Sequence, residues 1–105
     1  MATILVTGAG GPCGIGAIKS LKTETTHQVV GVDMDAVAAG LYLADDGRSI
    51  PPAADETWPT EMASVVDEFD VDVVVPTVDE ELAALPSLTE SLPDDVPIVA
   101  PRQDV

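Results

Sequence analysis

The sequence has very few residues of the kinds that form disulfides and bind metals. It contains one cysteine, Cys13, and one histidine, His27. One cysteine cannot form an internal disulfide, and with one histidine it cannot supply the three or four ligands of a zinc site. We therefore expect no metal site in this chain.

Long apolar runs and aromatic residues are also scarce. No apolar run approaches the roughly 20 residues that a helix needs to cross a bilayer. The N-terminus leads straight into a short apolar segment without the basic region of a signal peptide. We therefore expect no contact with a membrane and a cytoplasmic location. Because only 3% of the residues are aromatic, the core must be built from Val, Leu, Ile and Ala.

Cationic residues are the third shortage. Four lysines and arginines stand against 19 aspartates and glutamates, which gives a formal net charge of −15. Binding to nucleic acid depends on lysine and arginine neutralising phosphates, so this composition excludes a nucleic-acid partner. The acids are scattered along the chain, and their mutual repulsion destabilises a compact state unless salt screens it. We infer that the protein is adapted to high salt.

What the sequence does contain is a glycine-rich stretch directly after its first apolar segment. The apolar run Ile4–Val6 is typical of a strand buried on both faces. Isoleucine and leucine at 15, 18 and 21 follow at helical spacing, and glycines stand between the two segments at 8, 10, 11, 14 and 16. A strand that turns sharply into a helix opens a doubly wound α/β unit. The N–H groups at the start of such a helix favour an anion above the strand.

The rest of the chain alternates between strand and helix patterns. Further strands are expected at 28–32, 48–50, 72–76 and 97–100, and further helices at 36–44, from 57 and from 77. Pro86 falls within the last helix and should kink or divide it. We predict a single α/β domain over residues 1–105. Its fold is a Rossmann-like, doubly wound parallel sheet of about five strands in the order 3-2-1-4-5, with helices on both faces.

The glycine stretch fits the T-G-A-x-G-x-x-G pattern of short-chain and extended dehydrogenases. Under this hypothesis Gly8, Gly11 and Gly14 bind NAD(P), and Asp33 at the end of the second strand binds the ribose. Pro12 counts against it, because proline has no N–H to donate to a pyrophosphate. A simpler alternative is that the glycines only permit the turn and close helix-to-strand packing.

Five segments, taken together in order, carry a second resemblance. They are ILVTGAGGP at 4–12, GVDMD at 31–35, AGLYLAD at 39–45, IPP at 50–52 and PTVDEEL at 76–82. This set resembles the N-terminal domain that precedes the ATP-grasp fold in carbamoyl-phosphate-synthase-like ligases, and the resemblance covers nearly the whole chain. In that family the ATP-grasp part binds ATP and magnesium and activates a carboxylate as an acyl phosphate, which an amine then attacks.

The resemblance implies a role for the two loops at one end of the sheet. The preceding domain closes one side of the active-site cleft, so its partners would be a C-terminal ATP-grasp domain or subunit and a small-molecule substrate. The substrate-binding residues would come from the glycine loop and from the loop after the fourth strand: Gly10, Gly11, Pro12, Thr77, Asp79, Glu80 and Glu81. The three acids could hold a substrate amine.

The same acids also have a purely structural explanation. Thr77-Val-Asp-Glu80 has the form of a capping box with Glu80 as the capping partner, and carboxylates in a first helical turn complement the helix dipole. Cys13 has no base beside it if His27 lies at the far end of the first helix. We therefore expect Cys13 to be a small buried thiol rather than a nucleophile.

The ATP-grasp signature itself does not follow. No lysine pair for nucleotide phosphates and no magnesium-binding set is present before Val105. We therefore expect the 105 residues to be a fragment or one piece of a split protein, without a cofactor of their own and catalytically silent alone. The alternatives are a small NAD(P)-binding module and a non-enzymatic α/β domain whose exposed faces need a partner.

The charge balance generates a prediction about stability. The midpoint of thermal unfolding should be higher in about 1 M potassium chloride than in dilute buffer, because salt screens the repulsion among the acids. Circular dichroism against temperature in both buffers measures it. Equal midpoints would refute the salt adaptation.

Overall fold

Four parallel strands form the central sheet. They lie in the order β3-β2-β1-β4, in a computed structural model that describes residues 2–35 and 43–99. The strands are β1 (Thr3–Val6), β2 (Gln28–Asp33), β3 (Asp46–Ser49) and β4 (Val73–Val75). This arrangement confirms the predicted parallel sheet and the order of its first four strands.

The fifth predicted strand is reduced to a single bridge. Ile98 pairs with Val74 in parallel: the Val74 N–H donates to the Pro97 carbonyl at 3.0 Å, and the Val99 N–H donates to the Val74 carbonyl at 2.8 Å. The chain thus runs beside β4 where it was predicted. A longer ladder is disfavoured because β4 has three residues and Pro97 has no N–H to donate.

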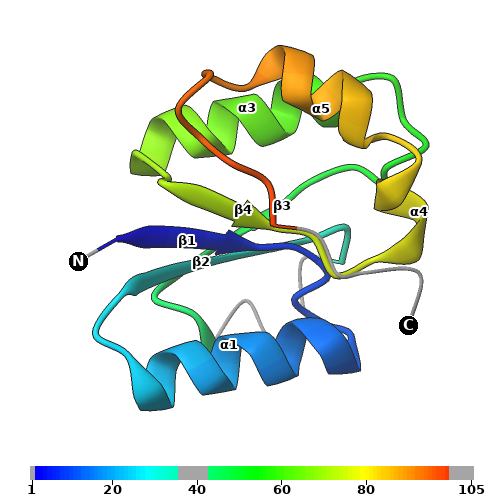
Figure 1. The fold of residues 1–105 in the computed structure, drawn as a ribbon. Coiled ribbons are helices and arrows are strands. Elements are labelled where there is room, and N and C mark those ends of the chain that lie inside the picture. The colour runs from blue at the N-terminus through cyan, green and yellow to red at the C-terminus, as the bar shows by residue number, and fades with distance from the viewer. Residues whose placement is uncertain (1, 36–42, 100–105) are drawn as a thin grey trace.

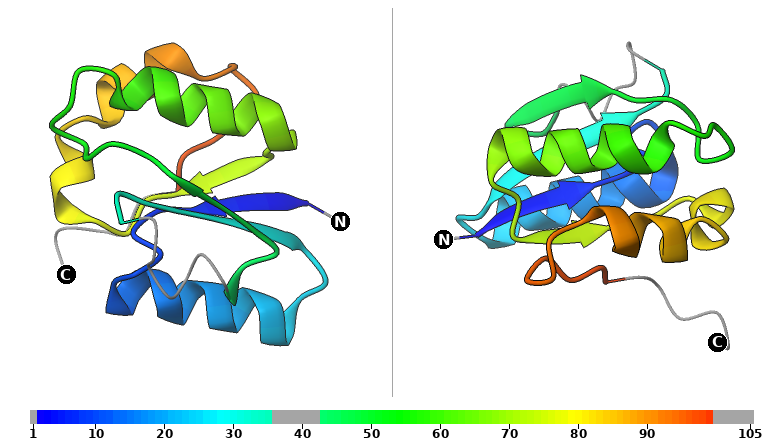
Figure 2. Two further views of the ribbon diagram at one scale, coloured as in Figure 1. Left: turned by 180° about the vertical axis from the view of Figure 1, so that it is seen from behind. Right: turned by 90° about the horizontal axis from the view of Figure 1, so that it is seen from above.

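Helices cover both faces of the sheet, which gives three layers. α1 (Pro12–Glu24) lies against one face, and α3 (Trp58–Phe69) and α5 (Leu85–Ser91) lie against the other (Figure 1). The reverse view shows the same layers, with the short α4 (Asp79–Leu82) beyond the carboxyl end of β4 (Figure 2). The helix predicted over 36–44 falls mostly on residues 36–42, which lie outside the described residues.

Two apolar clusters fill the spaces between these layers. Along β1, Leu5 faces the cluster under α3 and α5, whereas Ile4 and Val6 face the cluster under α1. Because side chains alternate along a strand, an apolar strand that feeds both clusters must be covered on both sides. The doubly buried strand predicted from the sequence is confirmed.

The start of α3 is also close to the prediction. Pro59 lies in the first turn, where its missing N–H leaves no bond unmade. Trp58, the first residue of α3, is completely buried and belongs to the core rather than only closing the helix end. Within the described parts of the chain its indole Nε1 has no hydrogen-bond partner.

Pro86 divides the last helical segment as predicted. α4 ends at Leu82, and α5 begins at Leu85 with Pro86 in its first turn. Leu88 and Leu92 are buried in the core, whereas Leu82 and Leu85 are half-buried. The last two of these four leucines thus belong to the core, and Leu85 packs against its edge.

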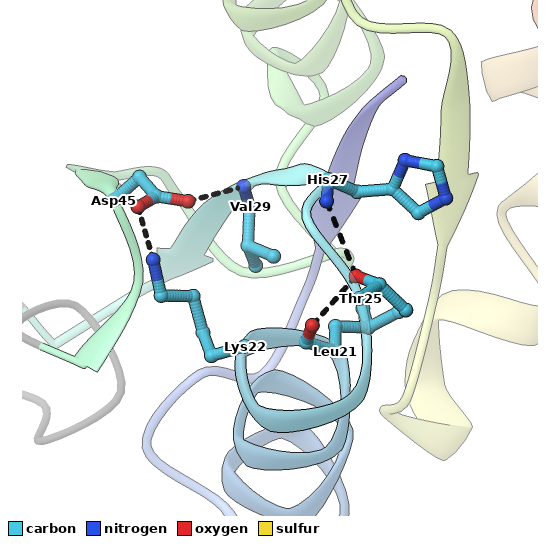
Figure 3. Close-up of polar contacts among 6 residues, drawn as sticks. All are labelled: Leu21, Lys22, Thr25, His27, Val29 and Asp45. Atoms are coloured by element: carbon cyan, nitrogen blue, oxygen red, sulfur yellow. Dashed lines mark hydrogen bonds and ion pairs between the residues drawn. The ribbon is translucent and has the colours of Figure 1, made fainter. Parts of the chain in front are cut away.

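Polar contacts fasten the far end of α1 to the sheet (Figure 3). The Asp45 carboxylate accepts the Val29 N–H at 2.7 Å and forms an ion pair with Lys22 of α1, which lowers the pKa of Asp45. In the connection to β2, the His27 N–H donates to the Thr25 hydroxyl. The His27 side chain is half-buried, and its Nδ1 accepts the Ala2 N–H at 2.9 Å.

Two glycines are required by close contacts at the start of α1. Gly8 has a φ of +58°, and a Cβ there would lie 2.6 Å from Val78 Cγ2. A Cβ on Gly14 would lie 2.1 Å from the Gly8 carbonyl oxygen, whereas one on Gly16 would meet nothing within 4 Å. The turn therefore depends on Gly8 and Gly14 and not on Gly16. This agrees with the simpler alternative, in which the glycines permit the turn and close helix-to-strand packing.

This difference gives a matched pair of substitutions. Gly14→Ala should lower the free energy of unfolding by about 3 kcal/mol or more, because the new methyl group meets backbone that cannot move aside. Gly16→Ala, in the same helix, should raise it by about 0.5–1 kcal/mol through helix propensity. Urea unfolding followed by Trp58 fluorescence measures both. Equal effects of the two substitutions would contradict the packing described for Gly14.

Candidate functional site

The glycine turn between β1 and α1 uses its own N–H groups inside the fold. The Ala9 N–H donates to the Val32 carbonyl at 3.1 Å, and the Gly11 N–H donates to the Gly8 carbonyl at 2.9 Å. Pro12 follows as the first residue of α1 and has no N–H. Ala9, Gly11 and Pro12 thus have no free N–H to donate to a pyrophosphate.

The Asp33 carboxylate accepts the N–H of Gly10, the residue between Ala9 and Gly11. Its Oδ2 accepts the Gly10 N–H at 2.8 Å, and its Oδ1 accepts the Asp35 N–H at 2.9 Å. The carboxylate that the dinucleotide hypothesis assigns to a ribose therefore holds the glycine turn against the end of β2. Gly10 owes its position to this bond.

A buried hydrogen-bond cluster joins the glycine turn to the loop after β4. Thr7, at the end of β1, is completely buried, and its Oγ1 donates to Glu81 Oε1 at 2.5 Å. Thr7 Oγ1 also accepts the Thr77 N–H at 2.9 Å, and Thr77 Oγ1 donates to the Thr7 carbonyl at 2.8 Å. We call Thr7, Thr77 and Glu81 the threonine–glutamate cluster. It fixes the two loops to each other.

Glu81, not Glu80, closes the start of α4. Its Oε1 accepts the Val78 N–H at 3.3 Å, while the Thr77 hydroxyl donates elsewhere and does not cap the helix. The predicted Thr77–Glu80 capping box is therefore wrong. Thr77 is bonded to Thr7 and is therefore not free to cap the helix. The helix begins at Asp79, with Val78 at the N-cap position.

The environment of Glu81 favours its neutral form. The side chain is 5% exposed, and this burial raises the pKa of Glu81 above its usual range; the charges of Asp33 and Glu80 act in the same direction. The hydrogen bonds from Thr7 and Val78 oppose the rise. Glu81 is thus an internal hydrogen-bonding group, poorly placed to act as a free carboxylate.

A cavity of about 350 Å³ lies between the glycine turn and the loop after β4. It brings together five of the seven predicted substrate-binding residues: Gly11, Pro12, Thr77, Asp79 and Glu80. The residues of the dinucleotide hypothesis, Gly8, Gly11, Gly14 and Asp33, line it too. Gly10 and Glu81 are not among its lining residues, and both are bonded to backbone or side chains of the fold.

Cys13 also lines this cavity and is exposed, so the expectation of a buried thiol is wrong. It follows Pro12 in the first turn of α1, whose start faces the cavity and not the core. The helical spacing begins at Ile15, so no apolar pattern in the sequence indicates on which side Cys13 lies.

A second cavity of about 260 Å³ adjoins the first and was missed by the sequence analysis. Its walls are mostly apolar and come from the end of β2, from the segment after β3 and from Val78: Val32, Met34, Ile50, Pro51, Pro52, Ala53 and Ala54. The two cavities share Gly8, Asp33, Val78 and Glu80. A molecule bound at the glycine turn can thus extend into the apolar one.

The described residues contain neither a metal-binding cluster nor a membrane-spanning helix. Across residues 2–35 and 43–99, no three His, Cys, Asp or Glu side chains are grouped so that they could hold a metal ion. No helix in the described part of the chain is long and apolar enough to cross a membrane.

Comparison with protein families decides the relationship. The profile of the PylC-like N-terminal domain matches residues 4–99. The chain belongs to the PylC-like N-terminal domain family. It is therefore a pre-ATP-grasp N-terminal domain, as the resemblance in the sequence predicted.

Solved structures share the fold of this PylC-like domain. Glycinamide-RNase-transformylase T from Mycobacterium tuberculosis is 15% identical, with a TM-score of 0.69 over 91% of the chain and 25% of its own length. A dTDP-glucose 4,6-dehydratase from Bacillus anthracis in complex with NAD is 19% identical, with a TM-score of 0.65 over 95% of the chain and 37% of its own length. These identities show the Rossmann-like fold alone. Comparison with curated proteins gives no significant match.

The buried carboxyl of this PylC-like domain generates a pH prediction. Because the pKa of Glu81 is raised in the folded state, its protonated form stabilises the fold below the usual value of 4.5, and this contribution is lost as pH rises toward the folded pKa. Glu81→Gln keeps an acceptor for Thr7 and cannot ionise. The free energy of unfolding of this variant minus that of the wild type should therefore increase as pH rises from about 4 to about 7.

Glu90→Gln, at an exposed residue of α5, is the matched control. It removes one acid from the same protein without touching the threonine–glutamate cluster. Urea unfolding at each pH gives both differences. A Glu81→Gln difference that stays flat with pH, or that follows the Glu90→Gln difference, would contradict the raised pKa.

Proposed function

We propose that this domain is the substrate-side lobe of an ATP-grasp ligase that joins a carboxylate to an amine, as in ligases like the carbamoyl-phosphate synthase large subunit. The domain does not catalyse the reaction alone. An ATP-grasp region binds ATP and magnesium and forms the acyl phosphate. The PylC-like domain closes one side of the cleft and positions the acceptor.

The observation that carries this proposal is the pairing of two loops at one cavity. The glycine turn supplies Gly11 and Pro12, and the loop after β4 supplies Thr77, Asp79 and Glu80. Asp79 and Glu80 are exposed carboxylates, and none of the described residues that line the cavity is a cation. Such a rim attracts a protonated amine and repels a phosphate.

Membership of the PylC-like N-terminal domain family supports a partner region. The chain spans 25% of the transformylase and 37% of the dehydratase it resembles. In this proposal the remaining part of the ligase, as a following domain or a separate subunit, supplies the nucleotide site. The exposed side of the cavity is where the two parts meet.

The NAD(P)-binding alternative draws support from the likeness to a dehydratase solved with NAD. The contacts of the glycine turn argue against it. Both Asp33 carboxylate oxygens are bonded to backbone N–H groups, and Pro12 has no donor. Titration with NADH, followed by nicotinamide fluorescence, should show no saturable binding at micromolar concentrations. Such binding would restore the alternative.

A steady-state assay tests the ligase proposal. The ligase is assembled from this domain and the ATP-grasp region encoded with it, and ADP release is measured with the carboxylate and amine substrates. Removing a rim charge by Glu80→Gln should raise KM for the amine about three- to tenfold, with little change in KM for ATP, because the lost attraction acts on the amine alone.

Glu90→Gln serves as the control and should leave both constants unchanged. This domain without an ATP-grasp region should release no ADP. Amine-dependent ADP release that is indifferent to Glu80→Gln would contradict the placing of the amine at this rim. No ADP release from the assembled protein with any carboxylate and amine would contradict the proposed function itself.

A further inference from the structure

A site that binds only an ammonium group does not need an apolar cavity, yet this end of the molecule has one. It lies where β2, the segment at 50–54 and Val78 converge. Ile50 is buried and belongs to the core under α3, so the floor of the cavity is fixed by core packing. Met34, in contrast, is 69% exposed and lies on its rim. An apolar wall that stays open to solvent leaves apolar surface for a ligand to cover.

The ionisable side chains that the described part of the chain contributes to this cavity are all acids. Asp33, Glu80 and Glu81 are among its lining residues, and within residues 2–35 and 43–99 no lysine, arginine or histidine lines it. Two cations of the fold are paired with other acids: Lys22 pairs with Asp45, and Arg48 pairs with Glu68. A cation entering the cavity would therefore meet uncompensated negative charge, whereas an anion would be repelled.

The three carboxyls are not equivalent. Asp33 is bonded to two backbone N–H groups, and Glu81 is buried against Thr7. Glu80 is exposed and lines both cavities. It is thus placed where the glycine-turn cavity and the apolar cavity meet, and it is the carboxylate best able to face a charge on a ligand.

We propose that the apolar cavity binds the hydrocarbon body of a small primary amine, whose ammonium group lies beside Glu80 at the junction of the two cavities. This proposal rests on the proposed function, because it names the class of acceptor for the same site. At about 260 Å³ the apolar cavity takes a short aliphatic chain or one small ring. Nucleotides and fatty acids do not fit the charge of the rim.

A chain-length series tests the proposal with simple probes. Propylamine, butylamine, pentylamine and hexylamine are titrated into the 105-residue protein, and backbone amide shifts are followed by NMR. Each added methylene should strengthen binding about fourfold until the cavity is filled, because each is transferred from water to an apolar wall. The shifts should concentrate on Gly8, Ala53 and Val78.

Three further probes separate charge from apolar contact. Methylamine carries the charge without the body, hexanol carries the body without the charge, and hexanoate reverses the charge. All three should bind at least about tenfold more weakly than hexylamine. Equal binding of hexylamine and methylamine would overturn the apolar contribution, and equal binding of hexylamine and hexanoate would overturn the choice of an amine.

Two variants locate the site. Ala54→Phe places a large side chain on the exposed rim and should weaken hexylamine binding about tenfold. Glu80→Gln should weaken it about fivefold, and Glu90→Gln should not change it. If Ala54→Phe does not fold, the comparison of hexylamine binding to Glu80→Gln and to Glu90→Gln still tests the site. Equal loss in the two glutamate variants would show general attraction to an acidic protein and overturn the site.

The outcomes separate this inference from the proposed function. If the ligase assay succeeds and hexylamine does not bind, the inference about the apolar cavity is wrong and the proposed function stands. If hexylamine binds as described and the assembled protein joins no amine to a carboxylate, the cavity is confirmed and the proposed function is wrong.

Discussion

The arrangement of this end of the molecule depends on one buried hydrogen bond, from the Thr7 hydroxyl to the Glu81 carboxyl. It joins the end of β1 to the first turn of α4. The same Thr7 hydroxyl accepts the Thr77 N–H and so also holds the loop between β4 and α4. The glycine turn follows directly after Thr7. Both cavities lie along this junction, so the positions of their walls depend on this buried hydrogen bond.

This bond has an energetic consequence for an acidic protein. Because its pKa is raised, Glu81 takes on a negative charge less readily than an exposed glutamate would, in a molecule whose formal net charge is −15. Burial of a polar group is unfavourable unless it is hydrogen-bonded, and Glu81 accepts from both Thr7 and the Val78 backbone. Glu81 therefore positions the loops, while Glu80 beside it stays exposed.

The sequence predicted those features that depend on local patterns. Apolar strands separated by helical segments predicted the parallel sheet, and Pro86 predicted the break between α4 and α5. The pattern at 77–81 could not show whether Glu80 or Glu81 turns inward, because that depends on Thr7, a residue distant in sequence. The apolar cavity could not be predicted, since its walls come from segments that meet only in the fold.

A double-mutant cycle between Thr7→Val and Glu81→Leu tests the central interaction most directly. The free energies of unfolding of the two single variants, the double variant and the wild type are measured in urea by the fluorescence of the buried Trp58. We predict a coupling energy of about 1–3 kcal/mol between the two residues. A coupling within about 0.3 kcal/mol of zero, as expected for the pair Thr7→Val and Glu90→Gln, would contradict the account.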